Sequence, residues 1–158
     1  MNAMERKEFL KSLGAGAAFA LTFPCLNGCS SGDEDLEQFP EPTGVDFTID
    51  LRTEDAASLT NNGGFILTKS NPADSLTDIV VARNLEGNFV AASQICSHQQ
   101  TDGVRFLTED GGIFRCSTHG ARFEQTGAPL NSVTSNPLKI FQTELNGDFL
   151  RVFEETNA

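Results

Sequence analysis

Cys96-Ser97-His98 and Cys116-Ser117-Thr118-His119-Gly120 are the two stretches that decide how this 158-residue chain is organised. Seventeen residues separate them, so the pattern is C-x-H followed by C-x-x-H. Both histidines of the chain lie in these stretches, and so do the two of its four cysteines that follow residue 29. Two thiolates and two imidazoles complete the coordination of a metal centre. We therefore expect one metal centre, held by two loops that each supply a cysteine and a histidine.

Three kinds of site fit this set of side chains. A [2Fe–2S] cluster takes two cysteines on one iron and two histidines on the other, and a structural zinc ion takes all four on one metal. Zinc-finger ligands usually occur as separate cysteine and histidine pairs, whereas here they are interleaved. A disulfide between Cys96 and Cys116 in an oxidising compartment would leave both histidines without a role. The pattern favours the cluster, with a zinc-stabilised Cys2His2 structural or binding module and the disulfide as alternatives.

The spacing and the glycine resemble the ligand motif of Rieske [2Fe–2S] proteins, in which a C-x-H loop is followed by a C-x-x-H-G loop. The resemblance implies a [2Fe–2S] cluster as the cofactor, with thiolates on one iron and imidazoles on the other. It implies the metal ligands Cys96, His98, Cys116 and His119. Gly120 is expected to support the second loop, because glycine lets the backbone turn sharply or pass close to a cluster.

The chain departs from the Rieske proteins of quinol-oxidising complexes at several loop positions. Thr101 and Thr118 stand where those proteins have two cysteines joined as a disulfide. Ala121 and Phe123 stand where those proteins have a serine and a tyrosine that donate to sulfur, and Gln99-Gln100 replaces a common glycine. Hydrogen bonds to sulfur favour the reduced cluster, so their loss predicts the lower half of the span from about −150 to +300 mV. The resemblance thus implies a ferredoxin-like carrier or small subunit of an oxidoreductase complex, with a redox protein as its partner.

The charge of the chain and its remaining motifs restrict the function further. Acidic residues outnumber basic residues by 22 to 11, which excludes nucleic acid as a partner and suits a redox partner with a basic docking patch. We find no nucleophile–base pair and no phosphate-binding loop. No histidine is left for the mononuclear iron of an oxygenase. We therefore assign no catalytic residues and expect an electron-transfer component rather than a stand-alone enzyme.

Residues 1–28 resemble a bacterial signal peptide. Arg6-Lys7-Glu8-Phe9-Leu10-Lys11 is similar to a twin-arginine signal in which lysine replaces the second arginine. The apolar stretch from Leu13 to Phe23 is shorter than the roughly 20 residues that span a bilayer. Leu26-Asn27-Gly28-Cys29 resembles a lipobox, which predicts lipidation at Cys29. We expect an exported lipoprotein of the bacterial cell envelope, anchored to the membrane on its periplasmic side or at the surface.

The rest of the chain divides into a tether and a domain. Residues 29–44 are polar, acidic and proline-containing, which predicts a disordered tether. Residues 45–158 consist of short β-patterned segments separated by turn residues, with at most a short helix at Asp55–Leu59. The predicted strands are Val45–Leu51, Phe65–Leu67, Ile79–Arg83, Phe89–Ala92, Ile113–Arg115, Leu138–Leu145 and Phe149–Phe153.

These segments predict an all-β fold, an antiparallel sandwich or partial barrel. The last two strands are expected to form a hairpin with a type I′ turn at Asn146-Gly147-Asp148. The Rieske resemblance adds a cluster-binding subdomain formed by the two ligand loops and extends over about Val45 to Phe153. Asn136-Pro137-Leu138 resembles the third loop that covers the cluster in that family.

Overall fold

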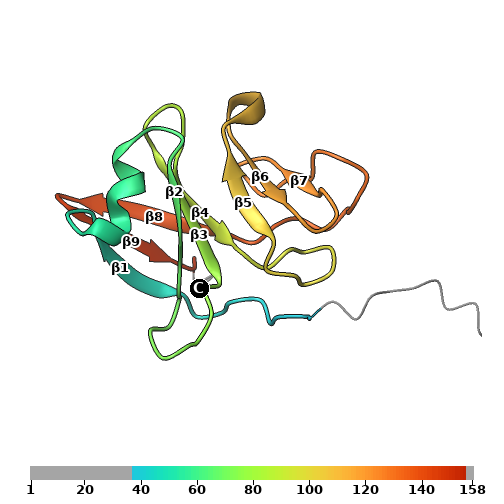
Figure 1. Cartoon of the computed structure of the whole chain (residues 1–158), viewed down its shortest axis with the longest axis horizontal. Coiled ribbons are helices and arrows are strands. Elements are labelled where there is room, and N and C mark those ends of the chain that lie inside the picture. Colours follow the sequence, from blue (N-terminus) through green and yellow to red (C-terminus); the bar gives the residue numbers. More distant parts are fainter. Residues whose placement is uncertain (1–36, 156–158) are drawn as a thin grey trace, which may run out of the picture. The chain divides into compact units, whose positions relative to one another are not determined.

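Two antiparallel sheets make up the part of the chain that the structure, a computed structural model, describes, which is residues 37–155 (Figure 1). The larger sheet has the strand order β1-β9-β8-β4-β3-β2, and the smaller sheet has the order β5-β6-β7. The strands are β1 Asp46–Asp50, β2 Phe65–Thr68, β3 Ile79–Arg83, β4 Phe89–Ser93, β5 Val104–Leu107, β6 Ile113–Cys116, β7 Arg122–Phe123, β8 Ile140–Asn146 and β9 Phe149–Phe153. Two short 3-10 helices complete the elements, η1 Glu54–Thr60 and η2 Glu109–Gly111.

The all-β prediction is confirmed. Every predicted strand has a counterpart, and the short helix expected at Asp55–Leu59 is η1. No helix among residues 37–155 has the length and apolar character needed to cross a membrane. The predicted signal peptide, the lipidation site Cys29 and the first part of the tether lie outside the described residues.

The turn between β8 and β9 differs from the prediction. Asn146 pairs with Phe149, so Gly147 and Asp148 form a two-residue loop. Only Gly147 of these two has a positive φ, at 61°. A type I′ turn needs positive φ at both central residues, whereas glycine at the first position alone is the pattern of type II′. The type I′ prediction is therefore wrong, because the glycine precedes the aspartate rather than following it.

Strand β3 is buried on both faces and separates two apolar clusters. Ile79 and Val81 point to one cluster, and Val80 and Ala82 point to the other, as the two-residue period of a strand requires. The first cluster, within the larger sheet, contains Val45, Leu59, Ile79, Val81, Ala91, Phe141, Leu150 and Val152. The second, which we call the intersheet core, contains Val80, Ala82, Ala92, Cys96, Val104, Phe106, Phe114, Cys116, Ala121, Phe123 and Leu138. Both cysteines of the predicted metal centre therefore lie in the intersheet core.

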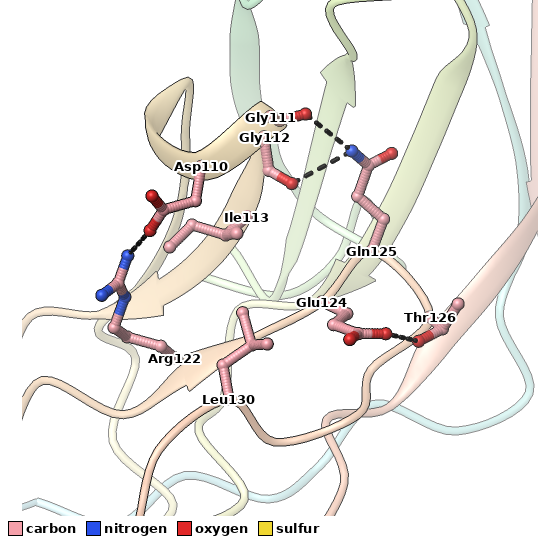
Figure 2. A pocket seen from close by; sticks show the side chains of 9 residues that line it. All are labelled: Asp110, Gly111, Gly112, Ile113, Arg122, Glu124, Gln125, Thr126 and Leu130. Atoms are coloured by element: carbon pink, nitrogen blue, oxygen red, sulfur yellow. Dashed lines mark hydrogen bonds and ion pairs between the residues drawn. The ribbon is translucent and has the colours of Figure 1, made fainter.

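A polar contact also joins the two sheets. Asn84, which follows β3 and is 6% exposed, donates through Nδ2 to Gln125 Oε1 at 3.0 Å. Gln125 Nε2 in turn donates to the carbonyl oxygens of Gly112 at 3.0 Å and Gly111 at 3.3 Å, as Figure 2 shows. Gln125 thus connects the end of β3 to the turn before β6, which is the strand that ends at Cys116.

Residues 37–44 lie against the domain, although we expected them to belong to a disordered tether. Pro42 is buried. Three hydrogen bonds hold the segment, from Phe39 N to Gln100 O (2.8 Å), from Lys139 Nζ to Pro42 O (2.9 Å) and from Gly44 N to Glu154 Oε2 (2.7 Å). The first of these bonds places the segment directly beside the first cysteine–histidine loop. Composition did not reveal this, because burial of one proline and three hydrogen bonds is enough to order a short polar segment.

Candidate metal centre

The two cysteine–histidine loops share one backbone conformation. We call residues 96–101 the first ligand loop and residues 116–121 the second. In each loop the cysteine N–H donates to the carbonyl five residues ahead, and the cysteine carbonyl accepts from the N–H four residues ahead. The bonds are Cys96 N to Thr101 O (2.8 Å), Gln100 N to Cys96 O (2.8 Å), Cys116 N to Ala121 O (2.8 Å) and Gly120 N to Cys116 O (3.0 Å). The two loops therefore present their cysteines and histidines in closely similar frames.

The fifth residue of each loop has a left-handed backbone. Gly120 has a φ of 73°, which glycine adopts without a steric penalty. Gln100 occupies the equivalent position with a φ of 54°. The absence of a glycine from the first loop thus leaves its conformation unchanged, at the cost of a strained non-glycine residue.

The structure brings the two thiols together in the intersheet core. Cys96 and Cys116 are each 1% exposed and are free cysteines rather than a disulfide. A hydrogen bond from the Cys96 thiol is the main cause that lowers the pKa of Cys116, and burial acts in the opposite direction. The same bond and burial raise the pKa of Cys96. The two thiols thus lie within hydrogen-bonding reach of each other, and a metal centre that bound both would displace their protons.

The two imidazoles form a second pair. The ring centroids of His98 and His119 lie 5.1 Å apart, with an angle of 88° between the ring planes. His119 is exposed and His98 is half-buried. Across residues 37–155, the structure groups no three His, Cys, Asp or Glu side chains around one point. The four predicted ligands lie as a thiol pair and an imidazole pair, which is the division that a [2Fe–2S] cluster with mixed ligands requires.

One atom of the site has an unmet bonding requirement. His98 Nδ1 is buried and has no hydrogen-bond partner among the described residues. Leaving a buried nitrogen unpaired costs roughly 1–3 kcal/mol, which a bond to a metal would offset. Together with the buried thiols, this nitrogen fits a bound iron–sulfur cluster.

Residues 131–138, which end with the predicted third loop at 136–138, are hydrogen-bonded to both ligand loops. Asn136 Nδ2 donates to Ser97 O at 3.3 Å, and Ser97 Oγ donates to Asn136 O at 2.9 Å. Asn131, which the sequence analysis did not identify, donates through Nδ2 to Gly120 O at 2.8 Å. The only sequence signal for Asn131 is an amide side chain in a polar stretch after the second ligand loop.

Two further features of the site were missed by sequence reasoning. Thr101 Oγ1 and Thr118 Oγ1 lie 2.9 Å apart, so these residues, which we call the threonine pair, link the two ligand loops. They stand where the quinol-oxidising Rieske proteins have a disulfide. Gly103 forms a wall of the site, because a Cβ placed there would lie 2.8 Å from Thr118 Oγ1 and 3.0 Å from Cys116 Sγ. The backbone thus approaches the cysteine more closely than any side chain would allow.

One protein family matches the part of the chain that holds both ligand loops. Residues 68–142 match the family described as the Rieske [2Fe-2S] domain. A comparison with curated proteins finds no match.

Three solved structures illustrate the range of similar chains. One, described as a complex of reduced oxygenase and oxidized ferredoxin in carbazole 1,9a-dioxygenase, shares 24% identity over 58% of this chain and 90% of that chain, with a TM-score of 0.45. The ferredoxin of carbazole 1,9a-dioxygenase from Nocardioides aromaticivorans IC177 shares 27% identity over 49% of this chain and 77% of that chain, with a TM-score of 0.43. The cyanobacterial plasma membrane Rieske protein PetC3 from Synechocystis PCC 6803 shares 28% identity over 47% of this chain and 74% of that chain, with a TM-score of 0.41.

The family match includes both ligand loops, the threonine pair and the whole third loop. A Rieske domain binds a [2Fe–2S] cluster, and the buried thiol pair, the imidazole pair and the unpaired His98 Nδ1 fit that group. Residues 68–142 are therefore a Rieske [2Fe-2S] domain.

Proposed function

We propose that this protein transfers single electrons through a [2Fe–2S] cluster that Cys96 and Cys116 hold at one iron and His98 and His119 hold at the other. When bound, such a cluster accepts and releases one electron at a time. The observation that carries the proposal is the arrangement of the four side chains as two pairs, with the thiols in the intersheet core and His119 at the surface.

The cysteine side and the histidine side of the site have different roles in this proposal. Cys116 is the last residue of β6, and its loop accepts a hydrogen bond from Asn131, so the backbone on the thiol side of the site is restrained. Rigid surroundings keep the reorganisation that accompanies electron transfer small. His119 is exposed at the end of its loop, where its ring edge is accessible to a partner. We assign the electron exit to His119.

The partner in this proposal is a redox protein, such as a larger subunit of a cell-envelope oxidoreductase complex. The two ligand loops contain no charged side chain, and neither do residues 131–138. The whole chain has a net charge of −11. A partner that docks over these loops therefore meets a neutral surface inside an acidic domain.

We also propose that Cys29 carries a lipid that anchors the protein in the bacterial cell envelope after export. The support is the Leu26-Asn27-Gly28-Cys29 motif and the preceding apolar stretch. Mass spectrometry of the N-terminal peptide from membranes tests this, and an unmodified Cys29 or an uncleaved N-terminus contradicts it. A Cys29→Ala variant is expected to leave the membrane fraction.

Absorption and electron paramagnetic resonance spectra, recorded before and after reduction with dithionite, test the electron-transfer proposal. We expect a coloured protein with about two irons per chain and a paramagnetic reduced state. Cys96→Ser is expected to abolish the spectrum, whereas Gln99→Ala in the same loop is the control that retains it. A colourless protein with about one zinc per chain would contradict the proposal and favour a structural metal site.

A further inference from the structure

Thr101 lies at the meeting point of the two ligand loops. It belongs to the first loop, is 6% exposed, and its hydroxyl lies between two groups of the second loop. Thr101 Oγ1 is 2.9 Å from Thr118 Oγ1 and 3.7 Å from Cys116 Sγ. Its own carbonyl accepts from Cys96 N at 2.8 Å, which fixes the backbone at this residue.

The number of available protons sets the direction of both contacts when Cys116 is a metal ligand. A cysteine binds metal as a thiolate, which has no proton to donate. The Thr101 hydroxyl has one proton, so it is the donor to Cys116 Sγ. The 2.9 Å contact with Thr118 must then use the proton of Thr118, with Thr101 Oγ1 as acceptor. The proton chain runs from Thr118 through Thr101 to the cysteine sulfur.

A donor aimed at a cysteine ligand favours the reduced state of an iron–sulfur site, because the reduced state is more negative. The effect is strong where water is excluded, and Thr101 is 6% exposed. The donation from Thr118 polarises the Thr101 hydroxyl and strengthens its own bond to sulfur. Ala121 and Phe123 carry no hydroxyl, so the threonine pair supplies a donor that the sequence analysis counted as missing.

We propose that Thr101 raises the reduction potential of this centre by donating a hydrogen bond to Cys116 Sγ, and that Thr118 reinforces that bond by donating to Thr101. This inference rests on the proposed function, since it needs a cluster on Cys116. It makes Thr101 a positioning and tuning residue rather than a catalytic one. The threonine pair also joins the ligand loops without a disulfide, so the link survives thiol reductants.

The test is the midpoint potential of the full-length holoprotein, measured by titration while the electron paramagnetic resonance signal is followed. Thr101→Val keeps the shape of the side chain and removes the donor. We expect its equilibrium to shift about tenfold toward the oxidised state, which for one electron is a decrease of about 59 mV. Thr101→Ser, which restores a hydroxyl, is expected to stay near wild type. Thr118→Val leaves the Thr101 donor in place and should produce a smaller decrease.

A matched control distinguishes an effect of the Thr101 hydroxyl on the reduction potential from a general effect of replacing threonine by valine. Thr126 is an exposed threonine whose hydroxyl donates to Glu124 Oε2, and Thr126→Val should leave the potential unchanged. A Thr101→Val protein with a full cluster and the wild-type potential overturns the inference. If that variant fails to bind iron, Thr118→Val decides, since a potential at or above wild type overturns the inference. A wild-type protein without a cluster would instead overturn the proposed function, and this inference with it.

Discussion

At the scale of single residues, the predicted metal ligands can be recognised in the sequence, whereas the residues that support the ligand loops cannot. Cysteine and histidine are rare in this chain, so their clustering alone predicts a metal site at Cys96, His98, Cys116 and His119. The supporting residues are of common types, and their roles depend on which loops lie side by side. They are Thr101, Thr118, Gly103 and Asn131. Distances such as the 2.9 Å within the threonine pair come from tertiary structure and have no signature in the order of residues.

Gly103 gives a sharp prediction at this scale. Gly103→Ala places a Cβ 2.8 Å from Thr118 Oγ1 and 3.0 Å from Cys116 Sγ, so these side chains of the second ligand loop must shift. We expect a loss of roughly 1–3 kcal/mol in the free energy of unfolding, together with reduced iron content. Urea unfolding and iron analysis measure both, with Asp102→Ala as an exposed neighbouring control. Wild-type stability and iron content in Gly103→Ala would show that the loops have room to spare.

The strained Gln100 gives a prediction of opposite sign. Its φ of 54° carries a steric cost that glycine avoids, although glycine also gains freedom in the unfolded chain. We expect Gln100→Gly to raise the free energy of unfolding by about 0.5–1 kcal/mol. Gln99→Gly, one residue away and without a positive φ, should lower it. Destabilisation of both variants to the same extent would mean that Gln100 is not strained.

At the scale of elements, short strands limited the prediction of the fold. The strands β5 and β7 were not predicted, because one has four residues and the other has two. They matter because β5 pairs with β6 in a register that sets Val104 opposite Cys116. This register brings the residues just before β5, which are the first ligand loop, beside the second ligand loop. The sequence therefore predicted the contents of the loops but not the pairing that brings them together.

The link between Asn84 and Gln125 is the element-scale prediction. Gln125→Ala removes two donors and one acceptor between the end of β3 and the turn before β6, and leaves buried Asn84 Nδ2 without its partner. We expect a loss of roughly 1–3 kcal/mol in the free energy of unfolding. A double-mutant cycle with Asn84→Ala should give a coupling of about 1 kcal/mol, measured by urea unfolding. Additive effects of the two substitutions would show that the sheets do not communicate through this pair.

At the scale of the whole molecule, Lys139 and Glu154 hold the segment before β1 against the domain by hydrogen bonds. Lys139 Nζ contacts Glu154 Oε1 at 2.7 Å and also donates to Pro42 O, while Gly44 N donates to Glu154 Oε2. The bond from Lys139 is the main cause that lowers the pKa of Glu154 below its ordinary value of 4.5, and the Gly44 N–H adds to it. The carboxylate is thus favoured in the folded protein, although the site is exposed enough for solvent to screen the pair.

The contacts of Glu154 predict that the stability of the protein depends on pH. Because folding lowers the pKa of Glu154, its contribution is present above the ordinary pKa and is lost as the pH falls through the folded value. Glu154→Gln should therefore be less stable than wild type at pH 7, and the two proteins should converge once the pH has fallen below the lowered pKa of Glu154. Unfolding curves at several pH values measure the difference, with Glu155→Gln as the neighbouring control. A difference that stays constant down to low pH would mean that the ionised carboxylate is not what holds the segment.

The distribution of charge predicts how electrons leave the molecule. Residues 37–155 contain eight basic and seventeen acidic side chains, whereas the ligand loops and residues 131–138 contain none. The charged residues directly at their flanks are Asp102, Arg115, Arg122 and Lys139. Charges beyond about 10 Å are screened at 0.1 M salt and act at about 30 Å in 0.01 M salt. In dilute buffer the acidic domain should therefore attract a cation. After correction for driving force, a cationic cobalt complex should oxidise the reduced protein faster than an anionic iron complex does. The two rates should approach each other at physiological salt, because the surface around His119 is then effectively neutral. Stopped-flow kinetics measure this, and a preference for the cation that persists undiminished at high salt would place acidic side chains at the electron exit.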